Sequence, residues 1–185
     1  MQTSIIISGF GGQGTLFAGQ VLTYAALDYG KHCTWIPSYG PEMRGGTAHC
    51  TVIISDEEIG SPLVRNPQVV LAMNLPSADK YETKMMPGGV MIANKSLINR
   101  DVLADNYSLL MIPANELAEE LGNKRITNMV MTGAMLELVD ALPLDVVKKS
   151  LEDHMPERNR KYLPMNFKAL ETGAAFAREN LPQPA

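Results

Sequence analysis

Cysteine and histidine are scarce in this sequence. The two cysteines, Cys33 and Cys50, form no C-x-x-C pair, and the three histidines, His32, His49 and His154, are scattered along the chain. Iron–sulfur clusters and structural zinc sites need several thiolate or imidazole ligands at short spacings. The sequence therefore predicts that this chain holds no metal ion and no cluster of its own.

Long apolar runs and an excess of positive charge are also missing. No stretch approaches the roughly 20 apolar residues of a membrane-spanning helix, and the start does not resemble a signal peptide, so we expect a cytoplasmic protein without membrane contact. The net charge of −4 argues against a nucleic-acid partner, which requires a basic surface. The one dense basic run, residues 158–162, is better explained as an exposed helix edge or loop.

Aromatic residues make up only 6% of the chain, whereas hydrophobic residues make up 45%, so the core should be mainly aliphatic. A chain of 185 residues suits one domain, which at this size buries about 70% of the surface of its unfolded chain. The twelve methionines are typical of adaptable packing, in the core or against a partner.

Short apolar runs alternate with longer amphipathic runs over the first 113 residues. We expect strands at residues 4–8, 32–36, 48–54, 69–73, 89–93 and 108–112. We expect helices at residues 15–29, 77–85, 115–121, 127–142, 144–154 and 166–179. Ser77 and Asn115 are predicted N-caps, Pro164 suits a helix start, and "GN" at 122–123 suits a helix end.

This alternation predicts an α/β fold, a single Rossmann-like domain with a mostly parallel sheet flanked by helices. Residues 1–113 would form the sheet core, and residues 114–185 would be a mainly helical completion of the same domain.

A glycine-rich turn, "GFGGQG" at residues 9–14, follows the first expected strand and precedes the first expected helix. This placement suits an anion at a helix N-terminus. A P-loop would need Lys and then Ser or Thr after Gly14, where the sequence has Thr15 and Leu16. A nicotinamide site would need a carboxylate at the end of the second strand, where the sequence reads "TWIPSYG".

Close packing of the first helix on its strand is the alternative explanation of these glycines. It accounts for Gly14 and Gly19, because the helix between them is built of small and apolar residues. It does not account for Gln13, whose amide needs hydrogen-bond partners.

A second unusual loop, "SYGPEMRGG" at residues 38–46, follows the second expected strand. In a parallel sheet it would share the carboxyl edge with the glycine turn. An exposed Glu42–Arg44 salt bridge is one interpretation, and a protein interface is the other, because Tyr and Arg are frequent anchors of interfaces. The predicted interface residues are Ser38, Tyr39, Gly40, Pro41, Glu42, Arg44, Gly45 and Gly46.

The two loops together resemble the gamma subunit of 2-oxoacid:ferredoxin oxidoreductases. The motifs "NMVMTGAM" at 128–135 and "NFKALETGAAF" at 166–176 fit helices of that family, so the resemblance covers nearly the whole chain. It implies an oxidoreductase complex that converts a 2-oxoacid and coenzyme A to acyl-CoA and CO₂ and reduces ferredoxin.

The resemblance also implies where the cofactors lie. Thiamine diphosphate, magnesium and the iron–sulfur clusters would be held by alpha, beta and possibly delta partner subunits, with no tightly bound cofactor and no catalytic residue in this chain. Coenzyme A would be a co-substrate whose phosphates could approach the glycine turn. The expected coenzyme A-proximal residues are Gly11, Gly12, Gln13, Gly14, Thr15 and Arg44.

The glycine turn taken by itself leaves a second hypothesis open. In that case the chain is a stand-alone Rossmann-like nucleotide-binding module with no larger complex. The motifs do not distinguish 2-oxoglutarate, branched-chain 2-oxoacids and pyruvate as substrates.

Overall fold

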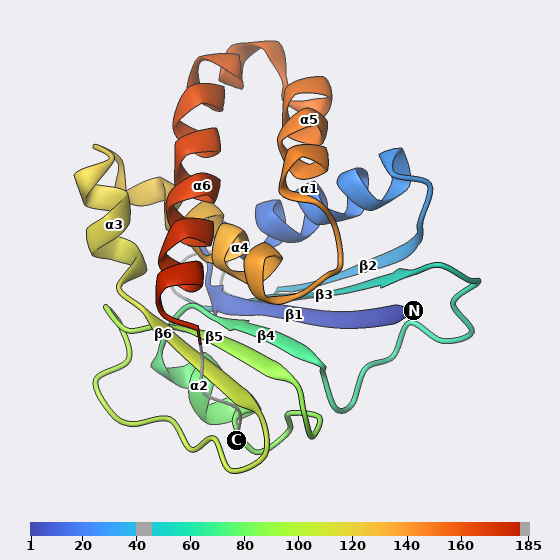
Figure 1. The fold of residues 1–185 in the computed structure, drawn as a ribbon, viewed down its shortest axis with the longest axis vertical. Coiled ribbons are helices and arrows are strands. Elements are labelled where there is room, and N and C mark those ends of the chain that lie inside the picture. Colours follow the sequence, from blue (N-terminus) through green and yellow to red (C-terminus); the bar gives the residue numbers. More distant parts are fainter. Residues whose placement is uncertain (40–45, 182–185) are drawn as a thin grey trace.

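The computed structural model describes residues 1–39 and 46–181 and contains one six-stranded sheet with helices on both faces (Figure 1). The strands are β1 (Gln2–Phe10), β2 (His32–Tyr39), β3 (Thr47–Ser55), β4 (Val69–Ala72), β5 (Val90–Asn94) and β6 (Ser108–Ile112). The helices are α1 (Thr15–Asp28), α2 (Leu75–Tyr81), α3 (Ala114–Glu120), α4 (Thr127–Leu138), α5 (Leu144–His154) and α6 (Leu163–Glu179), with short 3-10 helices η1 (Lys124–Ile126) and η2 (Glu157–Tyr162).

The strand order is β2-β3-β1-β4-β5-β6. β1, β4, β5 and β6 pair in parallel, whereas β3 is antiparallel to both of its neighbours. All six expected strands form, and the prediction of a mostly parallel sheet is confirmed. Because β3 runs opposite to both neighbours, β2 points the same way as β1, and every strand except β3 ends at one edge of the sheet, called here the carboxyl edge.

Two hydrophobic clusters lie on the two faces of the sheet. The larger cluster joins alternate residues of β1, β3 and β4 to α1, α4, α5 and α6. The smaller cluster joins the opposite side chains of β1, β4 and β5 to α2 and to the segment before β6, and it contains no buried residue of β2 or β3. Figure 1 shows the same arrangement, with α1, α4, α5 and α6 above the sheet and α2 below it.

The predicted helix ends were partly wrong. Asn74, not Ser77, is the N-cap of α2, because its Oδ1 accepts the Ser77 N–H at 3.0 Å and starts the helix two residues earlier. Pro113 occupies the N-cap of α3, and Asn115 lies inside that helix. α4 ends at Leu138 rather than residue 142, because Val139 is extended. The expected helix end at Gly122, which has φ +87°, and the proline in the first turn of α6 are confirmed.

Helices α4 and α6 cross through paired glycines. A Cβ added at Gly133 would overlap the backbone of Leu170, and one added at Gly173 would overlap the backbone of Val130. The two helices therefore approach each other as closely as their backbones allow. Both glycines belong to the motifs that carried the family resemblance.

Candidate functional site

The glycine turn and the end of the β2–β3 connection meet at the carboxyl edge. The Gly11 N–H donates to the Gly46 carbonyl at 2.9 Å, so the two loops singled out in the sequence are neighbours. Gly12 has φ +99° and Gly14 has φ +76°, a left-handed conformation that favours glycine. The turn therefore needs glycine at both positions for its backbone geometry alone.

Gly14 packs against α4 rather than against a strand, which corrects the expected strand–helix crossing. The Asn128 Nδ2 donates to the Gly14 carbonyl at 3.1 Å, and a Cβ on Gly14 would lie 2.5 Å from that nitrogen. The expected close packing on strands holds for Gly19, where a Cβ would overlap Cys50 Sγ of β3.

The side-chain amide of Gln13 was expected to need hydrogen-bond partners, and the structure provides them. Its Oε1 accepts the Phe10 N–H at 2.7 Å and the Asn74 Nδ2 at 3.0 Å. Its Nε2 lies 3.4 Å from the Met73 carbonyl, a long contact at the limit of a hydrogen bond. The Gln13 side chain thus ties the end of β1 to the end of β4.

The amide contacts continue across the carboxyl edge to the later strands. The Asn94 Nδ2 donates to the Met73 carbonyl at 3.2 Å and lies 3.1 Å from Asn115 Oδ1. Asn74 is 2% exposed and Asn94 is fully buried. We call Gln13, Asn74, Asn94 and Asn115 the amide network.

The amide network occupies the place where this kind of fold usually binds ligands. The chain leaves β1 for α1 on one face and leaves β4 for α2 on the other face. Such a reversal opens a crevice between the carboxyl ends of the two strands, where doubly wound folds bind nucleotides. Here Gln13 and Asn74 bridge that crevice from both sides.

A small hollow of about 200 Å³ lies beside the crevice. It is lined by Gly12, Gln13, Met73, Asn115, Lys124, Arg125 and Thr127. Lys124 pairs with Glu119 at 2.5 Å, whereas Arg125 makes no ion pair with any residue of 1–39 or 46–181. The start of α1 next to this hollow has no acidic residue in its first turn and no capping side chain among the described residues.

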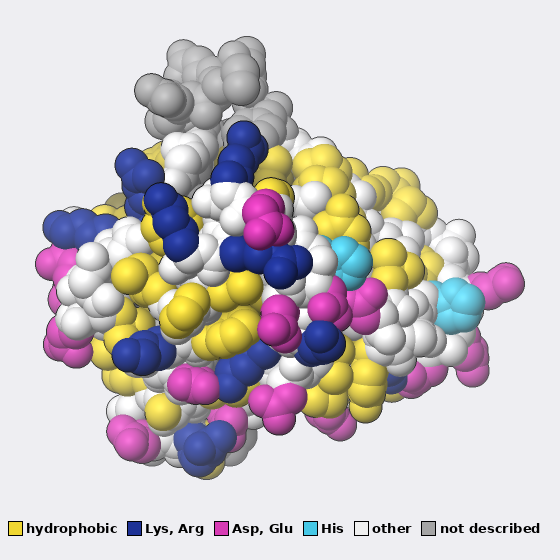
Figure 2. All heavy atoms as spheres, turned by 90° about the horizontal axis from the view of Figure 1, so that it is seen from above, with side chains coloured by type: hydrophobic (Ala, Val, Ile, Leu, Met, Phe, Trp, Pro, Cys, Tyr) yellow, Lys and Arg dark blue, Asp and Glu magenta, His cyan; other side chains and the backbone are white. Residues whose placement is uncertain are grey.

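The sequence analysis missed Lys124 and Arg125 as members of this edge. The letters "KR" directly after the Gly122 turn were the only signal, and basic residues are common near helix ends. Figure 2 shows Lys and Arg side chains gathered toward the upper edge of the helical face, with acidic and basic side chains mixed over the rest of that face. The run 158–162 forms η2, which buries no side chain, as predicted.

The other predicted site residues differ in accessibility. Thr15 is 2% exposed, so its side chain faces the core, whereas Gly12 is exposed at the turn. Ser38 is half-buried at the end of β2, and Gly46 accepts the hydrogen bond from the glycine turn. The side chain of Tyr39 and the residues Gly40, Pro41, Glu42, Arg44 and Gly45 lie outside the described part of the chain.

A more enclosed hollow of about 300 Å³ lies between α1 and α5, on the helical side of the sheet. Its rim includes the Tyr24 ring, which stacks on His154 at 4.5 Å between centroids, and His154 Nε2 lies 2.9 Å from Asp28. Phe17 and Tyr24, which line it, are 38% and 37% exposed, so α1 is less deeply buried than its apolar sequence suggested.

Together these features define a class of protein, a Rossmann-like α/β domain whose nucleotide crevice is bridged by its own amide side chains. The family model described as "Pyruvate ferredoxin/flavodoxin oxidoreductase" matches residues 4–176. The chain belongs to this family, as the two loops indicated.

Curated relatives and a solved structure agree with this assignment. The chain is 37% identical to the ketoisovalerate oxidoreductase subunit VorA of Methanothermobacter marburgensis over 97% of its own length, but it spans only 37% of that relative. It is 33% identical to the 2-oxoglutarate synthase subunit KorC of Methanocaldococcus jannaschii, over 97% of this chain and 96% of that one.

The solved structure is that of a keto/oxoacid ferredoxin oxidoreductase gamma subunit from Geobacter sulfurreducens PCA. It is 30% identical, with a TM-score of 0.82 over 96% of this chain and 99% of that chain. The predicted fold class is confirmed by this likeness. None of the helices in the described residues is long and apolar enough to span a membrane.

Proposed function

We propose that this chain is the gamma subunit of a thiamine-diphosphate-dependent 2-oxoacid:ferredoxin oxidoreductase complex. The complex would cleave the bond between the carboxylate and the oxo carbon of its substrate, release CO₂ and join the acyl group to the thiol of coenzyme A. The two electrons released would pass singly to ferredoxin, and the thiol proton would go to solvent. This chain would supply a docking surface and no turnover of its own.

The amide network is the observation that best supports a role without turnover. Gln13 and Asn74 bridge the crevice that a nucleotide would otherwise enter, and opening it would leave buried amides without partners. Each lost partner of that kind costs about 1–3 kcal/mol. Family membership and the likeness to a gamma subunit supply the context.

The cofactors of such a complex would lie on its other subunits. No three His, Cys, Asp or Glu side chains of residues 1–39 and 46–181 come together as a ligand set. Cys33 and Cys50 instead donate to the carbonyls of Thr23 and Thr15. We assign thiamine diphosphate, magnesium and the clusters to alpha, beta and possibly delta partners, and a cytoplasmic location stays a prediction.

Association with the partner subunits is the test of this proposal. The chain, co-expressed with tagged alpha and beta subunits encoded in the same genome, should co-purify with them as a stable complex. The Tyr39→Ala/Arg44→Ala variant should fold alone yet associate at least tenfold more weakly, because aromatic and Arg anchors dominate interface energies. A matched Lys95→Ala/Lys168→Ala variant should associate normally.

Two results would contradict this. Failure of the wild-type chain to associate would exclude the subunit role. Unchanged association of the Tyr39→Ala/Arg44→Ala variant would exclude the loop at 38–46 as the docking surface. The Met-rich helix α4, which the sequence also suggested as a docking face, is not available for this role, because residues 127–136 are buried inside this chain.

A second role, contact with coenzyme A, is supported by the carboxyl edge. Three features together favour an anion: the exposed turn at Gly12, the start of α1, and the guanidinium of Arg125. Within residues 1–39 and 46–181, no side chain caps α1 and none forms an ion pair with Arg125. We place the phosphates of coenzyme A near Gly11, Gly12, Gly14 and Arg44. The amide of Gln13 and the buried side chain of Thr15 would support this turn.

Steady-state kinetics of the assembled complex test this role. Arg44→Ala and Arg125→Ala should each raise the apparent KM for coenzyme A severalfold and leave that for the 2-oxoacid unchanged. Lys168→Ala, an exposed cation on α6, is the control. Equal changes for both substrates, or none, would assign the two arginines a structural role only.

The alternative, a stand-alone nucleotide-binding module, keeps support from the same hollow beside Arg125. Calorimetric titration of the isolated chain with NAD, NADP, ATP and FAD separates the two hypotheses. Micromolar affinity for any of them would favour the module, whereas the subunit proposal predicts no saturable binding.

A further inference from the structure

The α2 side of β3 and β2 carries no helix among residues 1–39 and 46–181, whereas Ile6 of the adjacent strand β1 is buried under α2. Register places Ile6, Thr51 and Ile36 in one row across these strands, and His49 and Ser38 in the next row. We call these five residues the open face. None of the β2 and β3 residues among them joins the smaller hydrophobic cluster, and Figure 1 shows α2 below β4 and β5 but no helix below β2 and β3.

The open face is accessible on the edge strand β2 and on its neighbour β3. Ile36 on β2 is 39% exposed and Ser38 is half-buried, and His49 and Thr51 are also only half-buried, although β3 has a strand on each side. Beside them lies a hollow of about 470 Å³ whose floor includes Ile6.

All the formally charged side chains that line this hollow are basic. Arg65, Lys80 and Lys84 line it together with His49, and no carboxylate does. None of the three cations makes an ion pair with any residue of 1–39 or 46–181. The whole chain has a net charge of −4, so a surface hollow lined by cations and by no carboxylate differs from the average composition of the chain.

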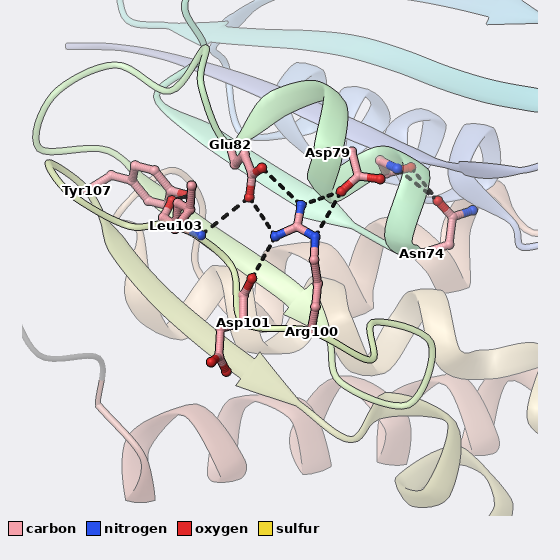
Figure 3. A network of polar contacts seen from close by, with 8 residues as sticks. Asn74, Asp79, Glu82, Arg100, Asp101, Leu103 and Tyr107 are labelled. Carbon is pink, nitrogen blue, oxygen red and sulfur yellow. Dashed lines mark hydrogen bonds and ion pairs between the residues drawn. The ribbon is translucent and has the colours of Figure 1, made fainter.

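Helix α2 and the turn that follows it separate their charges between two sides. Asp79 and Glu82 are held by the Arg100 guanidinium, and Glu82 Oε1 lies 2.9 Å from its Nη2 (Figure 3). Lys80 and Lys84 line the hollow instead. The acidic side chains next to these lysines in sequence are therefore engaged elsewhere and do not neutralise them.

His49 contributes hydrogen-bonding capacity and little charge near pH 7. Burial, and the nearby charge of Lys80, lower the pKa of its imidazole below the usual value. The Thr51 hydroxyl beside it adds a second polar group. An apolar sheet surface with neutral polar groups and a rim of cations is complementary to an apolar segment that carries carboxylates.

We propose that the open face is an interface for an acidic segment of another subunit, in which carboxylates meet Arg65, Lys80 and Lys84 and apolar side chains cover Ile36. This inference rests on the proposed function, because it requires a complex. A protein partner fits better than a small anion, because the surface extends from the hollow across two strands to Ile36. It is a second docking surface, which adjoins the loop at 38–46 and shares only Ser38 with it.

Charge reversal tests the interface in the co-expressed complex. Lys80→Glu/Lys84→Glu should raise the Kd for the partner subunits roughly tenfold or more and abolish most of its salt dependence. The matched control is Lys95→Glu/Lys168→Glu, which makes the same change in net charge at exposed positions elsewhere. Circular dichroism melts of both free variants should lie close to the wild type, since these side chains make no ion pair with residues 1–39 or 46–181. The one aromatic contact given up is that of Lys80 Nζ with the Tyr81 ring, 5.0 Å from its centroid.

Each outcome separates the hypotheses. If the wild-type chain does not associate, the proposed function fails, whatever the variants do. If the wild type associates and the Lys80→Glu/Lys84→Glu variant does so with the same Kd and salt dependence, only the open-face interface is overturned. Saturable binding of inorganic pyrophosphate that the variant loses, with assembly unchanged, would make the hollow a small-anion site and would also overturn the proposal.

Discussion

Gly14 meets two constraints at once, a left-handed backbone and contact with Asn128. Its φ of +76° disfavours any side chain, and the space for a Cβ is taken by the Asn128 amide, 2.5 Å away. This amide also donates to the Gly14 carbonyl, so it cannot move without losing a hydrogen bond. The turn therefore positions α1 and α4 together.

Gly14→Val should lower the free energy of unfolding by about 3 kcal/mol, from backbone strain and overpacking combined. Gly12→Ala is the matched control, because φ there is +99° but no atom of residues 1–39 or 46–181 lies within 4 Å of the added Cβ. The control should cost only about 1 kcal/mol, the strain alone. Urea denaturation of both variants measures the difference, and equal losses would show that contact with Asn128 contributes nothing.

Cys50 should be chemically inert in the folded protein. Burial raises the pKa of its thiol to about 11, and its Sγ contacts the Thr15 carbonyl inside the main core. The thiolate is the reactive form, and at pH 8 only about one thiol in a thousand with such a pKa is ionised. Iodoacetamide followed by mass spectrometry should leave Cys50 unmodified until denaturant is added. Rapid alkylation in the native state at pH 8 would contradict this burial.

At the scale of elements, the crossing of α4 and α6 depends on glycine. Gly173→Ala would press a methyl group into the Val130 carbonyl and should destabilise the fold by about 3 kcal/mol. Ala175→Ser, on the exposed side of α6, should change stability by no more than about 0.5 kcal/mol. Thermal melts compare the two, and a Gly173→Ala variant as stable as the wild type would mean that the helices can separate freely.

The elements themselves could be predicted from the sequence because their signals are local. Each strand is an apolar run bounded by turn residues, and all six were found. The ends of α2 and α3 were not. Asn74 and Ser77 are both good caps, and only the proline in the first turn after Asn74 distinguishes them locally. Asn115 resembles a cap but bonds the neighbouring Asn94 instead.

The candidate site was predictable only where its residues adjoin in sequence. The glycine turn was visible as a motif in the sequence. Its contact with Gly46 follows because β1 and β2 run in the same direction and end at the same edge of the sheet. Arg125 comes from a distant segment and reaches the same edge only because α4 packs beside α1 at Gly14 and Asn128. The open face likewise depends on strand order, which hydrophobic patterns do not specify.

At the scale of the whole molecule, the two faces of the sheet have different roles. Four helices cover one face, whereas the other has a helix under only half of it and a cationic hollow beside the rest. Such asymmetry is expected of a domain that is completed by other chains, since an isolated domain gains nothing from leaving one face of two strands exposed.

Reconstitution of activity tests this account most directly. A preparation of the alpha and beta subunits made without this chain should oxidise its 2-oxoacid slowly or not at all, in a thiamine-diphosphate- and coenzyme A-dependent assay with ferredoxin. Addition of the purified chain should restore turnover saturably, and the chain alone should show none. Full activity of the alpha and beta subunits without it, or turnover by the isolated chain, would contradict the account.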